Sequence, residues 1–210
     1  FKEALYTWQL WALCYILFFL SGAGLMVIYN VIAIGTAVGL TLSAYFISLT
    51  ALSNGFGRVV GGLVADHIGK YIPLLSITPL HLLAVVAANM TIIQGILSLG
   101  IQATILPGFL IVSFYYGCTA SSISVNITDI FGPDYVATNL GFIETSPILG
   151  SFIFTSLVVI GFYSDDTVNN EGNLICQGRN CFEMPFLISS IACSIAAVIA
   201  IYMSYTKDPI

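Results

Sequence analysis

Arg58 is the first residue of this sequence that invites a chemical interpretation, because it stands alone in a long apolar stretch. Thr50 and Asn54 precede it at intervals of four residues, so the three side chains share one face of a helix. A guanidinium can hold a carboxylate through two parallel hydrogen bonds. The pattern therefore predicts either a contact for an anionic substrate or a structural Arg that pairs with an acid or caps helix ends.

A second polar stripe follows further along the chain, with steps of four, three, four and three residues. Its members are Tyr115, Thr119, Ser122, Asn126 and Asp129. This spacing places all five on one helix face. Such a face could line a cavity, but small hydroxyl residues are also common where helices pack closely. We prefer the cavity and keep helix packing as the alternative.

Glu144 is the other isolated charge, one helical turn before Pro147. A proline removes a backbone hydrogen bond and can kink a helix. A buried acid beside a kink could carry a proton, since burial favours the neutral carboxyl. It could also pair permanently with Arg58 or with a residue outside this chain.

Cys176 and Cys181 share the longest polar segment and predict a disulfide. Zinc is the alternative, but two cysteines without a nearby histidine do not make a four-ligand site, so we predict no metal and no cofactor. The sequence shows no nucleophile–base arrangement, no phosphate loop and no basic patch for nucleic acid. These observations argue against an enzyme.

The elements that carry these residues are membrane helices, because charge is nearly absent from the chain. Charged residues make up 7% of the 210 residues and hydrophobic ones 58%, against roughly 25% charged in a soluble domain. A spanning helix needs about 20 apolar residues. Four charge-free runs meet this need, at 4–57, 71–128, 145–164 and 184–206. The first two runs are each long enough for two crossings.

The sequence thus predicts an all-α membrane domain over residues 1–210 with six transmembrane helices. Turn residues and polar breaks place them at about 6–29, 40–65, 72–92, 104–130, 137–162 and 185–205. We expect Arg58 to point into this bundle and away from lipid, because a charge facing hydrocarbon is costly.

Orientation follows from the basic residues. Six crossings put Lys2, Lys70 and Lys207 on the side of both termini, and Arg179 on the other. Positive charge marks the cytoplasmic face, so we expect cytoplasmic termini and a 164–183 loop on the outer or lumenal side. We expect a plasma membrane or endomembrane location rather than a mitochondrial one.

The segment 62–70, GLVADHIGK, is the most specific motif. It resembles the signature of the major facilitator superfamily, and it lies in the expected place between the second and third helices of a six-helix half. The matching positions are Gly62, Asp66, His67, Gly69 and Lys70, with His67 where the family usually has Arg or Lys. The resemblance implies a cytoplasmic gate in which Gly62 permits close helix approach and Gly69 a tight turn.

Further segments resemble the second half of nodulin-like major facilitator proteins, namely 1–5, 21–25, 54–62 and 176–182. The resemblance implies one half of a fold of two six-helix bundles that works by alternating access around a central cavity. The chain begins at Phe1, and we expect an N-terminal six-helix half, in the same protein or in a partner subunit, to complete it.

We therefore expect a secondary transporter of a small organic solute, a carboxylate or another organic anion. Arg58 would contact the anion, and the polar residues named above would line the path. The alternative is a structural half-transporter subunit of a larger membrane complex. In either case the partners are the lipid bilayer and a second membrane half, and a transporter adds a small-molecule substrate.

Overall fold

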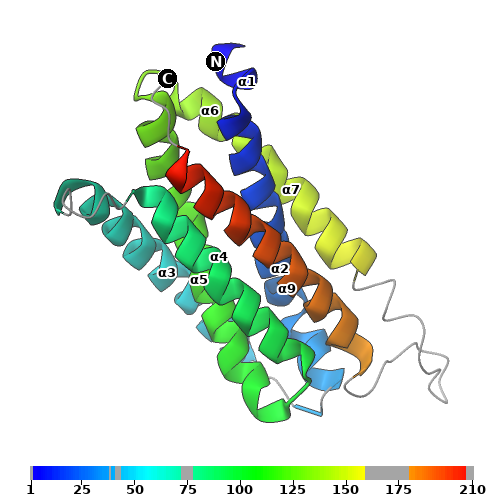
Figure 1. Cartoon of the computed structure of the whole chain (residues 1–210). Coiled ribbons are helices and arrows are strands. Elements are labelled where there is room, and N and C mark those ends of the chain that lie inside the picture. Colours follow the sequence, from blue (N-terminus) through cyan, green and yellow to red (C-terminus); the bar gives the residue numbers. More distant parts are fainter. Residues whose placement is uncertain (1, 38, 41–43, 72–77, 159–179, 207–210) are drawn as a thin grey trace.

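The computed structural model describes residues 2–37, 39–40, 44–71, 78–158 and 180–206, and these residues are helical apart from short connections (Figure 1). A short first helix, α1 (Lys2–Leu5), precedes the bundle. The remaining elements are α2 (Trp8–Ala37), α3 (Ala44–Tyr71), α4 (Pro79–Ser98), α5 (Gln102–Phe131), α6 (Val136–Ile143), α7 (Thr145–Ser151), the π-helix η2 (Phe152–Val158) and α9 (Asn180–Tyr205).

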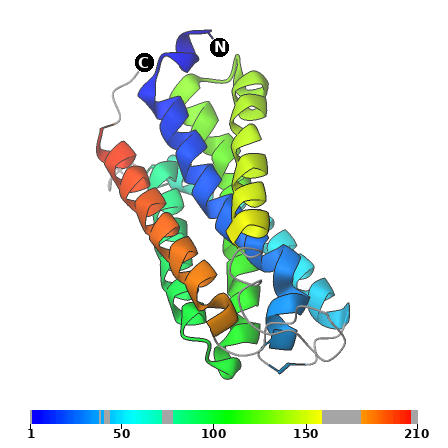
Figure 2. The same cartoon turned by 90° about the vertical axis from the view of Figure 1, so that its right-hand side faces the viewer.

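These elements make six helical passes, because α6, α7 and η2 follow one another along a single line (Figures 1 and 2). Aromatic contacts show which ends meet. Trp8 at the start of α2 lies 5.7 Å from Tyr202 near the end of α9, measured between ring centroids. Trp11 lies 5.8 Å from Phe142 at the end of α6. The start of α2 and the end of α9 therefore lie on the same side of the bundle.

The passes form two groups that share a common core: the α4–α9 pair, and the other four passes. Helix α4 packs along α9 in the foreground of Figure 1, and α2 and α5 lie behind them. Helix α3 packs mainly against α5, and α7 packs against α2. The face built from α2, α3, α5 and the α6–α7 segment is thus on the side of the bundle away from the α4–α9 pair.

Four of the described helices are long and apolar enough to cross a membrane, at Trp8–Thr36, Pro79–Ser98, Gln102–Phe131 and Phe182–Tyr205. The outer side of α9 exposes a stripe of large apolar residues at helical spacing, Leu187, Ile191, Ile195, Val198 and Tyr202. A stripe of this kind suits lipid and would be unfavourable in water. The chain is therefore a multi-pass membrane protein, and the two passes outside this set carry the isolated charges Arg58 and Glu144.

The loops expected between the first and second helices and between the third and fourth are largely helical, because polar side chains there bond to a backbone carbonyl of their own helix or of a neighbouring one. The expected loop at 30–38 is helical almost to its end, since the Asn30 amide donates to the Met26 carbonyl at 2.9 Å. The expected loop at 94–102 begins only after Ser98. Gln94 is fully buried in α4, and its side-chain nitrogen donates to the Ala23 carbonyl of α2 at 3.2 Å.

The expected fifth helix at 137–162 is divided, and the break lies three residues before Pro147. Helix α6 ends at Ile143, and α7 begins at Thr145. Pro147 has no N–H to offer the carbonyl of Ile143, and its ring crowds that carbonyl. The proline therefore interrupts the helix one turn earlier, and the interruption falls on Glu144.

Helix boundaries elsewhere also shift. The third and sixth helices were expected at 72–92 and 185–205, whereas α4 runs over 79–98 and α9 begins at Asn180. The second helix was expected to end at Ala65, followed by a charged turn. Instead α3 continues to Tyr71, so the segment 66–70 is helical. Gly69 therefore makes no tight turn, and positive φ among the described glycines occurs only at Gly39, Gly100 and Gly132.

Candidate functional site

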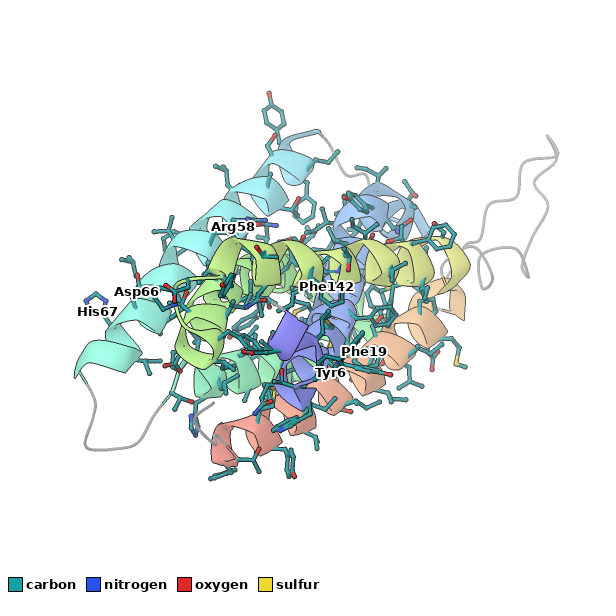
Figure 3. All side chains as sticks on the ribbon, turned by 90° about the horizontal axis from the view of Figure 1, so that it is seen from above. Tyr6, Phe19, Arg58, Asp66, His67 and Phe142 are labelled. Carbon is teal, nitrogen blue, oxygen red and sulfur yellow. The ribbon has the colours of Figure 1, made fainter. Side chains whose placement is uncertain are left out.

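Arg58 lies at the midpoint of α3, roughly 20 Å from either end at 1.5 Å per residue. The sequence placed it nearer the cytoplasmic side, because α3 was expected to end at Ala65. Its side chain is exposed on the surface of this bundle, so the expectation that these helices enclose it is wrong. Figure 3 shows the Arg58 side chain on α3, away from the end of that helix that carries Asp66 and His67.

The stripe that was expected around Arg58 splits into two environments. The Arg58 Nε donates to Asn54 Oδ1 at 3.2 Å, so these two side chains form one polar unit. Thr50 is only 2% exposed and donates its hydroxyl to the Ile47 carbonyl of its own helix. Thr50 therefore packs inside the bundle. Asn54 and Arg58 are polar residues of the face built from α2, α3, α5 and the α6–α7 segment, which we call the open face.

The stripe on α5 points into the bundle for most of its length. Thr119, Ser122 and Asn126 are fully buried. Each bonds to a carbonyl of α5 one turn earlier, and the Asn126 amide also lies 3.5 Å from the Pro79 carbonyl at the start of α4. This geometry favours the packing alternative for these three residues. Tyr115 is half-buried against the core, and Asp129 is exposed at the other end.

Glu144 occupies the joint between α6 and α7, with its side chain exposed. The joint is firmly placed, because the next residues pack against α2. Ser146 and Pro147 are buried, and Gly150 lies so close to Phe18 that a Cβ there would collide with the Phe18 carbonyl oxygen. The backbone that carries Glu144 is thus held at a fixed place beside α2.

Tyr116, which the sequence did not single out, lies on α5 in the same middle part of the bundle as Arg58. It sits at the midpoint of α5 and is half-buried. Its phenol lies within electrostatic range of Arg58 of α3, Tyr29 of α2 and Glu144 of the α6–α7 joint. We refer to Tyr29, Arg58, Tyr116 and Glu144 as the central polar cluster. Tyr116 could have been found only by asking which side of α5 faces α3, because it lies one residue off the predicted stripe.

Glycines bring α3 and α5 together beside this cluster. A Cβ on Gly117 would lie 2.9 Å from the Arg58 backbone nitrogen and would collide with the Asn54 carbonyl oxygen. A Cβ on Gly57 would collide with the Phe114 carbonyl oxygen in the same way. The backbones therefore touch, which fixes Arg58 relative to Tyr116. Gly62 of the gate motif is not a close contact, since its Cβ would meet Ser121 at an ordinary 3.7 Å.

The remaining gate-motif residues lie in the last turns of α3. Asp66 and His67 are exposed, and a ring nitrogen of His67 lies 2.8 Å from the Leu63 carbonyl one turn earlier. His67 points away from the bundle in Figure 3. Gly69 and Lys70 follow on the same helix. The gating role of these five positions stays a prediction.

The expected disulfide falls outside the described residues, since Cys176 lies in the segment 159–179. Cys14, Cys118 and Cys193 are buried free thiols. The part of the chain that the structure describes contains no group of three or more His, Cys, Asp or Glu residues that could hold a metal ion.

Comparison with known proteins gives one informative similarity. The chain is 32% identical over 142 residues to the oxalate:formate antiporter of Oxalobacter formigenes. The matched residues are 67% of this chain and 32% of the relative, so the chain spans about a third of that protein's length. No family model matches the sequence. The similarity is therefore to part of a transporter.

Proposed function

We propose that the chain is one half of a secondary transporter of the major facilitator type, and that it moves a small organic anion by alternating access. The observation that carries this proposal is the exposed guanidinium at the middle of α3. An Arg at the centre of a membrane helix costs about 2.5–3.5 kcal/mol on insertion scales unless it meets water or a partner. We propose that water meets Arg58 here, so that the face that bears it borders a water-filled path.

Two further observations support the proposal. The relative is named for oxalate and formate, which are both small carboxylates. The segment 62–70 resembles the major facilitator signature and ends the same helix that carries Arg58. The nodulin-like resemblance of the segments 21–25 and 54–62 is a finer prediction within that class.

Each polar group on the open face has a role in this proposal. Arg58 grips the carboxylate of the substrate through two hydrogen bonds, and Asn54 holds the guanidinium from behind through Nε. Tyr116 presents its phenol beside this contact. An N-terminal six-helix bundle covers the open face, and the substrate site lies between the two halves near the middle of the membrane, as is common in such transporters.

Replacement of Arg58 by Lys tests the proposal while keeping the positive charge. Lys cannot form the planar two-bonded contact, and losing one bond to a charged group costs about 1.5–3 kcal/mol, or about 10- to 100-fold in affinity. We expect uptake of labelled formate or oxalate by the full-length protein in proteoliposomes, normalised to folded protein, to fall by this factor. Arg179→Lys is the matched control and should retain full uptake.

A purely structural Arg58 gives the opposite pattern. The Arg58→Lys protein would then be obtained in lower yield, but each folded molecule would transport as well as the unaltered protein. That result would remove Arg58 from the substrate site and leave the chain as a structural membrane subunit.

A further inference from the structure

The two histidines of the chain have opposite hydrogen-bonding roles. His67 Nδ1 lies 2.8 Å from the Leu63 carbonyl, which can only accept, so this nitrogen carries a proton. His81 Nδ1 instead accepts, since the backbone N–H of Thr78 donates to it at 3.1 Å. A ring nitrogen that accepts carries no proton, so the His81 ring is neutral, with its proton on Nε2.

His81 closes the start of α4 together with Thr78. Thr78 directly precedes the helix, and His81 is its third residue. The His81 N–H donates to the Thr78 carbonyl at 2.9 Å, and the Thr78 hydroxyl lies 3.0 Å from His81 Nδ1. In the usual capping box, Glu or Gln occupies this third position and accepts the same backbone N–H. Histidine can replace them only while its ring is neutral.

Protonation of the His81 ring would oppose the first turn of α4 in two ways. An imidazolium carries protons on both nitrogens and accepts no hydrogen bond, so the Thr78 N–H would lose its partner. The new positive charge would lie at the start of the helix, where the helix dipole is also positive. Imidazole is the side chain that changes charge between about pH 5 and 8, so this change falls in the physiological range.

The first turn of α4 contacts two neighbouring helices. The His81 ring meets the Tyr205 ring near the end of α9 edge to face, with the ring centroids 6.2 Å apart. The Pro79 carbonyl lies 3.5 Å from the side-chain nitrogen of Asn126 on α5. The segment 72–77 joins this turn to the end of α3, whose last turns carry the gate motif. The cap therefore lies at the gate-motif end of the bundle.

Other titratable residues lie at the same end of the helices that pack against α4. These helices are α9, α5 and α3. The residues in question within the described ranges are Tyr202 and Tyr205 of α9, Asp129 of α5, and Asp66, His67, Lys70 and Tyr71 of α3. Asp66 and Asp129 are exposed, so water screens their charges. The bond from the Thr78 N–H is the interaction that protonation of the His81 ring removes directly.

We propose that His81 is a pH-sensitive switch at the start of α4. While the ring is neutral, the cap is closed and the first turn of α4 holds its contacts with α9 and α5. When the ring takes up a proton, the cap opens and this turn loosens at the end of the bundle that carries the gate motif. The switch goes beyond the proposed function, and it is tested without a transport assay.

Hydrogen exchange of a peptide covering residues 78–84, measured in the full-length protein in detergent micelles, tests this switch. The comparison variant is His81→Gln, which keeps an acceptor for the Thr78 N–H but cannot take up a proton. Comparing the two proteins at one pH removes the direct effect of pH on exchange. Between about pH 7.5 and 5.5, exchange in the unaltered protein should rise about 2- to 30-fold relative to His81→Gln, the factor expected for loss of a helix cap.

Two controls assign the effect to the His81 ring. His81→Ala removes the acceptor and should exchange faster than His81→Gln at both pH values. His67→Gln replaces the other histidine and should keep the full pH response, because His67 Nδ1 already donates its hydrogen bond. The switch is overturned if the unaltered protein and His81→Gln exchange alike at both pH values, if His81→Ala is as protected as His81→Gln, or if His67→Gln abolishes the response.

Discussion

Gly117→Ala should loosen the contact between α3 and α5 that positions Arg58. The new Cβ would lie 2.9 Å from the Arg58 nitrogen and 3.1 Å from the Asn54 carbonyl carbon, and it would collide with the Asn54 carbonyl oxygen. All of these are backbone atoms, which cannot rotate away as a side chain can. Since contacts of this kind are comfortable at about 3.5 Å or more, the contact with the Asn54 carbonyl oxygen requires α3 to withdraw by roughly 1–1.5 Å.

The energetic cost follows from two opposing terms. Overpacking a well-packed interface costs about 1–3 kcal/mol. Replacing glycine by alanine inside a helix gains about 0.5–1 kcal/mol, because alanine loses less backbone entropy. Gly55→Ala on α3 isolates this gain, since a Cβ there has nothing within 4 Å. The two variants should therefore differ by about 1–3 kcal/mol in the free energy of unfolding.

Equilibrium unfolding in mixed detergent micelles, followed by circular dichroism, measures that difference. The uptake of formate by folded Gly117→Ala protein should also fall, because Arg58 moves relative to Tyr116. If Gly117→Ala proves as stable and as active as Gly55→Ala, then α3 and α5 do not touch as described, and the argument for a positioned Arg58 fails.

The remaining predictions concern packing and topology. Gly57→Ala and Gly117→Ala together should destabilise by less than the sum of the single variants, because both strain one interface, and a fully additive result in the same unfolding assay would contradict this. Single cysteines placed at Lys70 and Asn170 should be labelled from outside intact cells at Asn170 alone, since the basic residues put Lys70 on the cytoplasmic side. Labelling at Lys70 but not at Asn170 would reverse the topology. Mass spectrometry of the unreduced 164–183 peptide should show a bridge between Cys176 and Cys181, and two free thiols in freshly isolated protein would argue against it.

The helical membrane architecture followed from sequence because charge and hydropathy determine which segments can lie in lipid. The charge-free runs predicted multiple crossings, and the break at Gly132 was readable from the Gly-Pro pair, where the structure gives Gly132 a φ of 75°. Helix ends were less predictable. Asn30 and Gln94 look like loop residues, but one bonds to its own helix and the other to α2, which only the packed structure reveals.

The candidate site was predictable as a set of isolated charges but not as a cluster. Arg58 and Glu144 stand out because charge is costly in a membrane. The direction in which each side chain points depends on how the helices are rotated against one another. For α3 and α5 this rotation is set by close glycine contacts such as that of Gly117. The stripe at Thr119, Ser122 and Asn126 has helical spacing, but periodicity cannot distinguish a face that lines a cavity from one that packs against α4.

The accessibility of the open face to water tests the central claim most directly. The experiment starts from a variant whose five native cysteines are replaced. Single cysteines are then introduced as Arg58→Cys and Glu144→Cys, with Val198→Cys as a lipid-facing control. Each variant is treated with a charged, membrane-impermeant thiol reagent. Val198 is 66% exposed on the apolar stripe of α9. We predict that the first two react, whereas Val198→Cys stays unmodified. If Arg58→Cys and Glu144→Cys are as unreactive as Val198→Cys, the face is dry and the transport path does not run there.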